Sequence, residues 1–282
     1  MDGLRSWGYG CSPHPQSGVR ISPAVLSSNP LCLCCKDEGG FLFAKMPWPC
    51  KMTGMNSQAS RTCCIRCGEC CLESNPTLQV KDQALVEGGY LRRKHLYTIR
   101  KGELVRDNVH GAVVPADQEM IKVREKRGSK GGCVFYDGKE RSCTIYENRP
   151  SQCSGLKCWD TAEFMGLYQS PKLQRKDVIE NSVLLGIIEE QEKRCSYAVL
   201  CDHVRRVSED GEKAVERILE LLKFDFHLRP FLSQKLGLRM EEMDFFFGRP
   251  LTETIVMFGL KVERQTDGGF FLTRIGRDGV ME

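Results

Sequence analysis

Cys64-Ile65-Arg66-Cys67-Gly68-Glu69-Cys70-Cys71 is the stretch around which the rest of the chain must be arranged. It places four cysteines in eight residues with the spacing C-x-x-C-x-x-C-C, and Cys63 comes immediately before it. Packing alone does not explain this density, because structural cysteines behave as small core side chains that gain nothing from being adjacent. Gly68 can take a positive φ and let the backbone fold around an ion. The stretch therefore predicts part of a metal or iron–sulfur site.

A second group of cysteines follows after about sixty residues that contain none. A zinc ion takes four thiolate or imidazole ligands and a [4Fe–4S] cluster takes four cysteines, so a C-x-x-C loop needs partners from elsewhere. We therefore expect one site assembled from two distant segments. Two sites, one polynuclear site and some thiols that are not ligands are the alternatives, since the cysteines outnumber four. The candidate ligands are Cys64, Cys67, Cys70, Cys71, Cys133, Cys143 and Cys153, with Cys158 as a further candidate.

Length and composition are those of a soluble globular protein. The chain has 282 residues, 41% hydrophobic and 28% charged, and its net charge of +4 is too small to indicate a nucleic-acid or membrane role by itself. No uncharged apolar run approaches the ~20 residues needed to cross a bilayer. The N-terminus lacks the apolar core of about 7–15 residues that a secretory signal requires. We therefore expect a cytoplasmic protein, in which the 16 cysteines stay reduced and those in clusters bind metal.

Three regions are predicted along the chain. Residues 1–55 hold six prolines and no sustained period of 2 or 3.6, and we interpret them as a disordered or misassigned extension with translation starting at Met52 or Met55. Residues 56–165 form the cysteine-cluster domain. Residues 166–282 form a mainly helical region that ends in a hairpin. The fold class predicted from this order is α+β, with short antiparallel strands in the cysteine-rich part.

Short strands are expected in the cysteine-cluster domain. Leu96–Ile99 and Glu103–Val105 flank Lys101-Gly102, which predicts a hairpin, and Met120–Arg124 alternates apolar and basic residues as a half-buried strand does. A further hairpin is expected where the turn dipeptide Asp137-Gly138 separates residues 133–136 from residues 142–146. This hairpin would bring Cys133 close to Cys143.

Asn148-Arg149-Pro150 is typical of a helix start, with the proline at the first helical position. Cys153 would then lie in the first turn, where the helix dipole favours a thiolate. Arg149 is a candidate for a hydrogen bond to the sulfur atoms of a bound cofactor, and an ordinary salt bridge is the alternative.

Helical spacing and turn signals describe the remaining residues. Apolar spacing predicts helices over residues 177–192, 197–207 and 214–226, and we expect Pro230 to interrupt the helical pattern. A terminal hairpin is expected between residues 260–263 and residues 269–272, around Asp267-Gly268.

The cysteine pattern resembles a known family. Three features look like the YkgJ-type cysteine-cluster proteins. They are the motif C-x-x-C-G-x-C-C, a cysteine ahead of a hairpin, and the run from Cys143-Thr144-Ile145-Tyr146 to Arg149-Pro150-Ser151-Gln152-Cys153. These proteins are described by a zinc- or iron-chelating CxxCxxCC domain and are often called Fe–S-cluster-containing proteins. The resemblance covers about residues 60–160. It implies that the seven main candidate cysteines take the family's positions and hold a [4Fe–4S] cluster or zinc, whereas Cys63, Cys158, Cys195 and Cys201 lie outside the pattern.

Beyond metal binding itself, three functional classes remain open. Part of the family resembles flagellin lysine methylases, but no glycine pair here opens the βα unit of a classical methyltransferase. The spacing of Cys63, Cys67 and Cys70 matches C-x-x-x-C-x-x-C, which suits radical chemistry or is a coincidence in a cysteine-dense stretch. A redox protein and a metal-stabilised binding module, with a protein partner, are the other classes. We do not expect nucleic-acid binding, because the basic stretch at Lys122, Arg124, Lys126, Arg127 and Lys130 is interleaved with glutamates.

Overall fold

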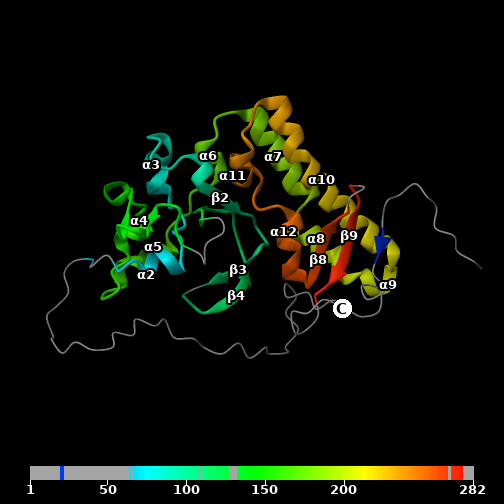
Figure 1. Cartoon of the computed structure of the whole chain (residues 1–282), viewed down its shortest axis with the longest axis horizontal. Coiled ribbons are helices and arrows are strands. Elements are labelled where there is room, and N and C mark those ends of the chain that lie inside the picture. Colours follow the sequence, from blue (N-terminus) through cyan, green and yellow to red (C-terminus); the bar gives the residue numbers. More distant parts are fainter. Residues whose placement is uncertain are drawn as a thin grey trace, which may run out of the picture.

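The computed structural model describes residues 20–21, 64, 67–107, 109–126, 132–265 and 268–275 (Figure 1). The predictions for Cys63 and for all of residues 1–55 except 20–21 lie outside the described residues. Short antiparallel strand pairs in the cysteine-rich part and a mainly helical C-terminal part confirm the α+β class. None of the described helices combines the length and the apolar character needed to cross a bilayer.

Short elements make up the cysteine-rich part of the chain. Its helices and 3-10 turns are α2 (Glu69–Glu73), η1 (Val80–Asp82), α3 (Gln83–Glu87), η2 (Arg93–His95), η3 (Tyr146–Asn148), α4 (Ser151–Gly155) and α5 (Ala162–Gln169). Its strands are β2 (Leu96–Ile99), β3 (Leu104–Asp107), β4 (Ala112–Pro115), β5 (Met120–Val123), β6 (Tyr136–Asp137) and β7 (Ser142–Cys143).

The predicted hairpin around Lys101-Gly102 is wrong. The turn exists, with Gly102 at φ 84°, but β2 pairs with β5 and β3 pairs with β4, both antiparallel. Tertiary partners explain the difference, because two charged residues of this turn, Arg100 and Glu103, are fully buried. Arg100 donates to Glu192 and Arg249 pairs with Glu103, so residues far along the chain hold the turn inside the molecule.

The predicted strand at Met120–Arg124 is confirmed. β5 alternates half-buried and buried residues, and Ile121 and Val123 are fully buried on one face of this strand. The second predicted hairpin is also present, although each of its strands is only two residues long. Tyr136 pairs with Cys143 and Asp137 with Ser142. The hairpin therefore brings Cys133 and Cys143 into one neighbourhood, because Tyr136 pairs with Cys143 and donates its N–H to the carbonyl of Cys133.

The C-terminal part is mainly helical, as predicted. Its elements are α6 (Arg175–Val178), α7 (Ser182–Arg194), α8 (Tyr197–Arg205), α9 (Val207–Asp210), α10 (Glu212–Leu236), η4 (Met240–Glu242), α11 (Met243–Phe247), α12 (Leu251–Thr254) and η5 (Ile255–Phe258). The predicted terminal hairpin is confirmed as β8 (Leu260–Arg264) and β9 (Phe270–Arg274), and β1 (Arg20–Ile21) pairs with β9 in parallel.

Two helix predictions need correction. The helix predicted over residues 177–192 is two helices, because the Asn181 side chain accepts a hydrogen bond from the N–H of Leu184 and so caps a new start at α7. Pro230 lies inside α10, which continues to Leu236. Burial of Leu232 in the core beyond the proline helps to offset the backbone hydrogen bond that a proline cannot donate.

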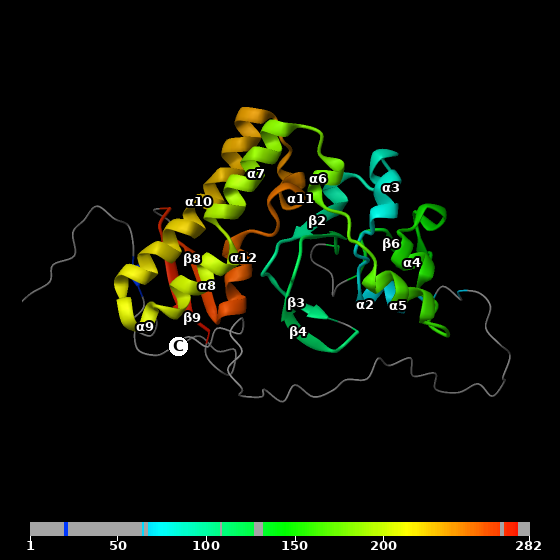
Figure 2. The same ribbon diagram turned by 180° about the vertical axis from the view of Figure 1, so that it is seen from behind.

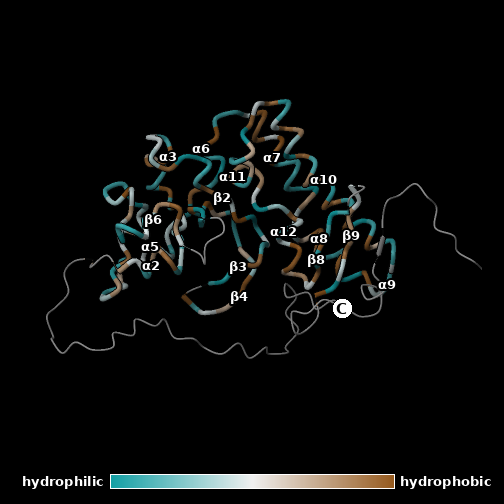
Figure 3. The backbone as a smooth tube through the Cα atoms, in the orientation of Figure 1, coloured by the Kyte–Doolittle hydropathy of each residue, from teal (hydrophilic) through white to brown (hydrophobic). Residues whose placement is uncertain are grey.

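Two hydrophobic cores lie side by side, and α10 contributes to both. The first core joins α8, α10, α12, η5 and the β8–β9 hairpin. Figure 3 shows hydrophobic colouring beside the α12 label, where η5 continues the chain. The second core contains Phe245, Phe246 and Phe247 of α11 together with Leu96, Ile121 and Cys133. Residues of the cysteine-rich part and of the C-terminal part thus form the second core together. The β3–β4 hairpin projects from the edge of the molecule (Figures 1 and 2).

Candidate metal centre

The first cysteine segment ends in the short helix α2. Gly68 precedes this helix in the left-handed conformation at φ 83°, and its carbonyl accepts hydrogen bonds of 2.9 Å from the N–H groups of Cys71 and Leu72. The helix therefore carries Cys70 and Cys71, whose Sγ atoms are 4.0 Å apart. Cys67 lies before the first turn, not on the helix face, and Cys64 is exposed.

The second segment docks directly onto the first. The N–H of Cys133 donates to the carbonyl of Cys71 over 2.7 Å, and Arg141 donates to the carbonyl of Cys67 over 3.4 Å. Tyr136 packs so closely on Gly68 that a Cβ at Gly68 would lie 2.5 Å from the Tyr136 Cζ atom. Since Tyr136 is the strand partner of Cys143, these contacts fix both hairpin cysteines beside the C-x-x-C loop.

Cys153 reaches the same region on α4. This helix starts at Ser151, so Pro150 is its N-cap and not its first residue as predicted. The buried carboxylate of Asp82 accepts hydrogen bonds from the N–H and the hydroxyl of Ser151, which anchors the helix start to η1. The N–H of Thr77 donates to Gln152 over 2.7 Å and adds a second anchor.

The adjacent thiols on α2 form a hydrogen bond with each other. Either Sγ atom can donate in the Cys70–Cys71 hydrogen bond, but the electrostatics favour Cys71 as donor. That bond lowers the pKa of Cys70, against the effect of burial, and raises the pKa of Cys71. Burial and the charges of Cys70, Cys153 and Cys133 raise the Cys71 pKa further. The pair therefore favours one thiolate and one thiol.

The surroundings of Cys133 and Cys153 raise the pKa of both thiols. Burial raises the pKa of Cys133, and Cys143 and Cys70 act in the same direction. Burial also raises the pKa of Cys153, with contributions from Cys133, Cys70 and Cys143. The prediction that the helix dipole favours a Cys153 thiolate is therefore wrong for the metal-free protein, because burial dominates over one short helix turn.

Cations beside the thiols act in the opposite direction. Arg149 donates from Nε to the carbonyl of Tyr146 over 2.7 Å and stacks 3.6 Å above the Tyr146 ring. Its charge lowers the pKa of both Cys70 and Cys153. Lys126 donates to the carbonyl of Tyr136, and its charge lowers the pKa of Cys133. The sequence singled out Arg149 but assigned Lys126 to a solvated basic stretch, and no local signal separates it from its neighbours.

Five of the seven candidate ligands form one group of interacting thiols: Cys70, Cys71, Cys133, Cys143 and Cys153. They do not yet form a coordination shell. Within the described ranges, no three His, Cys, Asp or Glu side chains lie close enough together to hold an ion. The donor set is nonetheless all sulfur, which suits zinc and iron–sulfur clusters and not Mg²⁺ or Ca²⁺.

The cysteines outside the predicted pattern lie elsewhere. Cys195 and Cys201 are buried in the core around α8 and α10, and burial raises the pKa of Cys195 to about 12. Cys158 is exposed after α4. The histidines at the described positions also have local roles: His110 contacts Asp107 over 2.6 Å, and the His95 ring packs edge-on against Phe135.

Comparison with known proteins agrees with the geometry. Residues 63–171 match the family model CxxCxxCC, described as a "Putative zinc- or iron-chelating domain". This confirms the resemblance inferred from the cysteine spacing and supports a metal-binding role for the region. No curated protein and no solved structure matches the chain.

Proposed function

We propose that residues 63–171 bind zinc or an iron–sulfur cluster through cysteines of both segments. The observation that supports this most is the group of five thiols, drawn from α2, the β6–β7 hairpin and α4, whose charges act on one another. Such a group is electrostatically unfavourable if its members ionise without a cation. A thiophilic metal ion would remove that repulsion, and the family match names zinc or iron.

The chain's own residues have distinct tasks in this proposal. Cys70, Cys71, Cys133, Cys143 and Cys153 would supply thiolates, and the loop residues Cys64 and Cys67 would close the site from the exposed side. Arg149 and Lys126 would offset the negative charge of the thiolates. The bound metal would act as a Lewis acid toward the sulfurs, and an iron–sulfur cluster would in addition carry an electron.

Metal binding should be coupled to folding and to proton release. Burial raises the pKa of Cys153 and of Cys133, so binding them as thiolates must release protons. The thiols must also move together, because no three of the described candidate ligands converge on one point. Binding should therefore draw α2, the hairpin and α4 together and stabilise this part of the fold.

The first prediction tests the two-segment site with serine substitutions. After anaerobic purification, Cys67→Ser and Cys143→Ser should each lower the metal content well below that of the wild type, because each removes a thiolate from a different segment. Metal and acid-labile sulfide analysis with an absorption spectrum measures the loss. The same data identify the metal, since a brown protein with sulfide holds an iron–sulfur cluster and a colourless one with zinc does not.

Cys195→Ala is the matched control, because Cys195 is buried in the other core and lies outside the thiol group. It should keep wild-type metal content. Wild-type metal stoichiometry in both serine variants would show that the site is not built from two segments.

A further inference from the structure

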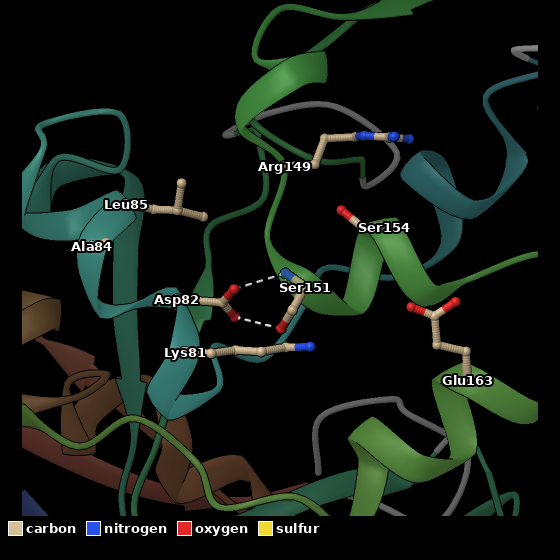
Figure 4. Close-up of a pocket in the computed structure, with 8 residues that line it drawn as sticks. All are labelled: Lys81, Asp82, Ala84, Leu85, Arg149, Ser151, Ser154 and Glu163. Atoms are coloured by element: carbon tan, nitrogen blue, oxygen red, sulfur yellow. Dashed lines mark hydrogen bonds between the residues drawn. The ribbon is translucent and has the colours of Figure 1, made fainter.

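An open cleft of about 340 Å³ lies beside the thiol group, and no cysteine is among the described residues that line it. It is lined by residues of η1, α3, α4 and α5 and by Arg149, which precedes α4 (Figure 4). A volume of this size suits a small organic molecule. Figure 4 shows Arg149 at one end of the opening and Lys81 at the other, with the Ser154 hydroxyl between them.

The floor of the cleft is fixed and its acidic group is already used. Asp82 accepts hydrogen bonds from the N–H and the hydroxyl of Ser151 and from the N–H of Gln79, at 2.8 to 2.9 Å. Because these donors occupy its oxygens, Asp82 positions the walls of the cleft and forms no described ion pair with Lys81 or Arg149. This pre-organisation lowers the entropy cost of binding.

Both cations of the cleft keep unused donors. The Lys81 side chain is exposed and has no hydrogen-bond or ion-pair partner among the residues that the structure describes. Arg149 uses Nε for the carbonyl of Tyr146, and no carboxylate of the described residues pairs with its guanidinium. The other acidic lining residue, Glu163, is paired with Lys157 at 2.9 Å. Among the described residues, Lys81 and Arg149 thus each lack a carboxylate partner, one at each end of the cleft.

We propose that this cleft binds a small organic dianion, with one oxyanion group at Lys81 and the second at Arg149. Carboxylate and phosphate oxygens are the groups that Lys and Arg donors bind best. Ala84 and Leu85 supply an apolar wall for the carbon chain between them, and Ser154 supplies a hydroxyl. Because the charge of Arg149 acts on Cys70 and Cys153, the ligand would lie next to the metal centre.

Isothermal titration calorimetry with the full-length, anaerobically purified protein tests this site. The probes are acetate, glutarate and 2-phosphoglycolate, in a buffer free of phosphate and sulfate. A dianion that contacts both cations should bind at least about tenfold more tightly than acetate, which corresponds to the ~1.4 kcal/mol of one added charged contact. The relative affinities of glutarate and 2-phosphoglycolate show whether the site prefers carboxylate or phosphate.

Two variants separate the cleft from general surface charge. Lys81→Met should weaken glutarate or 2-phosphoglycolate binding about tenfold, and Lys176→Met, which removes an exposed lysine outside the cleft, should change it less than about twofold. No saturable binding of either dianion to the wild type, or equal losses in both variants, would overturn the proposal. The metal content of the same samples is measured separately. A protein without bound metal can still bind the dianion, so failure of the metal proposal and failure of the anion proposal are distinguishable.

Discussion

Gly68→Ala is expected to destabilise the cysteine-rich part and to remove most of its bound metal. Gly68 adopts φ 83°, a left-handed conformation that costs a residue with a Cβ about 1–2 kcal/mol. The added Cβ would also collide with the Tyr136 ring, at 2.5 Å from Cζ and 2.9 Å from Cε2. Both effects act at the point where the first cysteine segment meets the second.

The consequence for the metal follows from the position of Tyr136. This residue pairs with Cys143 and its N–H donates to the carbonyl of Cys133 over 2.9 Å. A shift of Tyr136 away from the new methyl group therefore carries both hairpin cysteines away from α2. Thermal unfolding followed by circular dichroism measures the stability, and metal analysis measures the loss of the site.

Gly138→Ala is the control for this experiment. Gly138 lies in the turn of the same hairpin, but its φ is outside the left-handed region and nothing lies within 4 Å of a Cβ built there. It should leave both the unfolding temperature and the metal content close to wild type. If Gly68→Ala behaved in the same way, the close approach of the loop to Tyr136 would have no role in the site.

Glu192→Ala is expected to lower the free energy of unfolding by about 3 kcal/mol, because it leaves two buried arginines without their shared partner. Glu192 accepts two hydrogen bonds of 2.9 Å from Nε of Arg100 and one of 2.7 Å from Arg175. The side chain of Glu192 is 28% exposed, whereas those of Arg100 and Arg175 are 0% and 3% exposed. Removing the acid therefore strands positive charge inside the protein.

The same network joins the two parts of the chain. Arg175 also binds Glu119, ahead of β5, and donates to the carbonyl of Phe246 in α11. Arg100, at the end of β2, donates to the carbonyl of Cys195 over 2.7 Å. Loss of Glu192 should thus loosen α7 and α11 from the sheet that supports the cysteine hairpin.

Glu190→Ala is the control for Glu192→Ala, and urea unfolding measures the free energy of unfolding of both variants. Glu190 lies on the same helix and its side chain is 71% exposed. Among the described ion pairs, its only partner is the exposed Lys193, at 3.7 Å. Its replacement should change the free energy of unfolding by less than about 0.5 kcal/mol. Equal effects of the two substitutions would mean that the buried network adds nothing beyond a surface charge.

Local sequence signals predicted the elements whose partners are close in the chain. The alternation at Met120–Val123 fixed a buried face, Asp137-Gly138 marked the turn of the cysteine hairpin, and Gly68 took the positive φ that its position suggested. The cysteine spacing also identified the family domain. For the strand, the turn and the glycine, the informative residues lie within a few positions of the feature that they determine.

Other features depended on partners far along the chain. Lys101-Gly102 suggested a hairpin, but burial of Arg100 and Glu103 against Glu192 and Arg249 directs the chain elsewhere. Helix-dipole reasoning favoured a Cys153 thiolate, yet burial and neighbouring thiols raise its pKa. These outcomes depend on which surfaces meet in the folded protein, and local spacing does not contain that information.

X-ray absorption at the zinc or iron edge identifies the atoms that bind the metal. With the protein purified anaerobically, we expect a first shell made of sulfur atoms, at about 2.3 Å if the metal is zinc. The sulfur signal should fall in Cys143→Ser and stay unchanged in Cys195→Ala. A first shell dominated by nitrogen or oxygen atoms would contradict a metal centre held by the cysteines of the two segments.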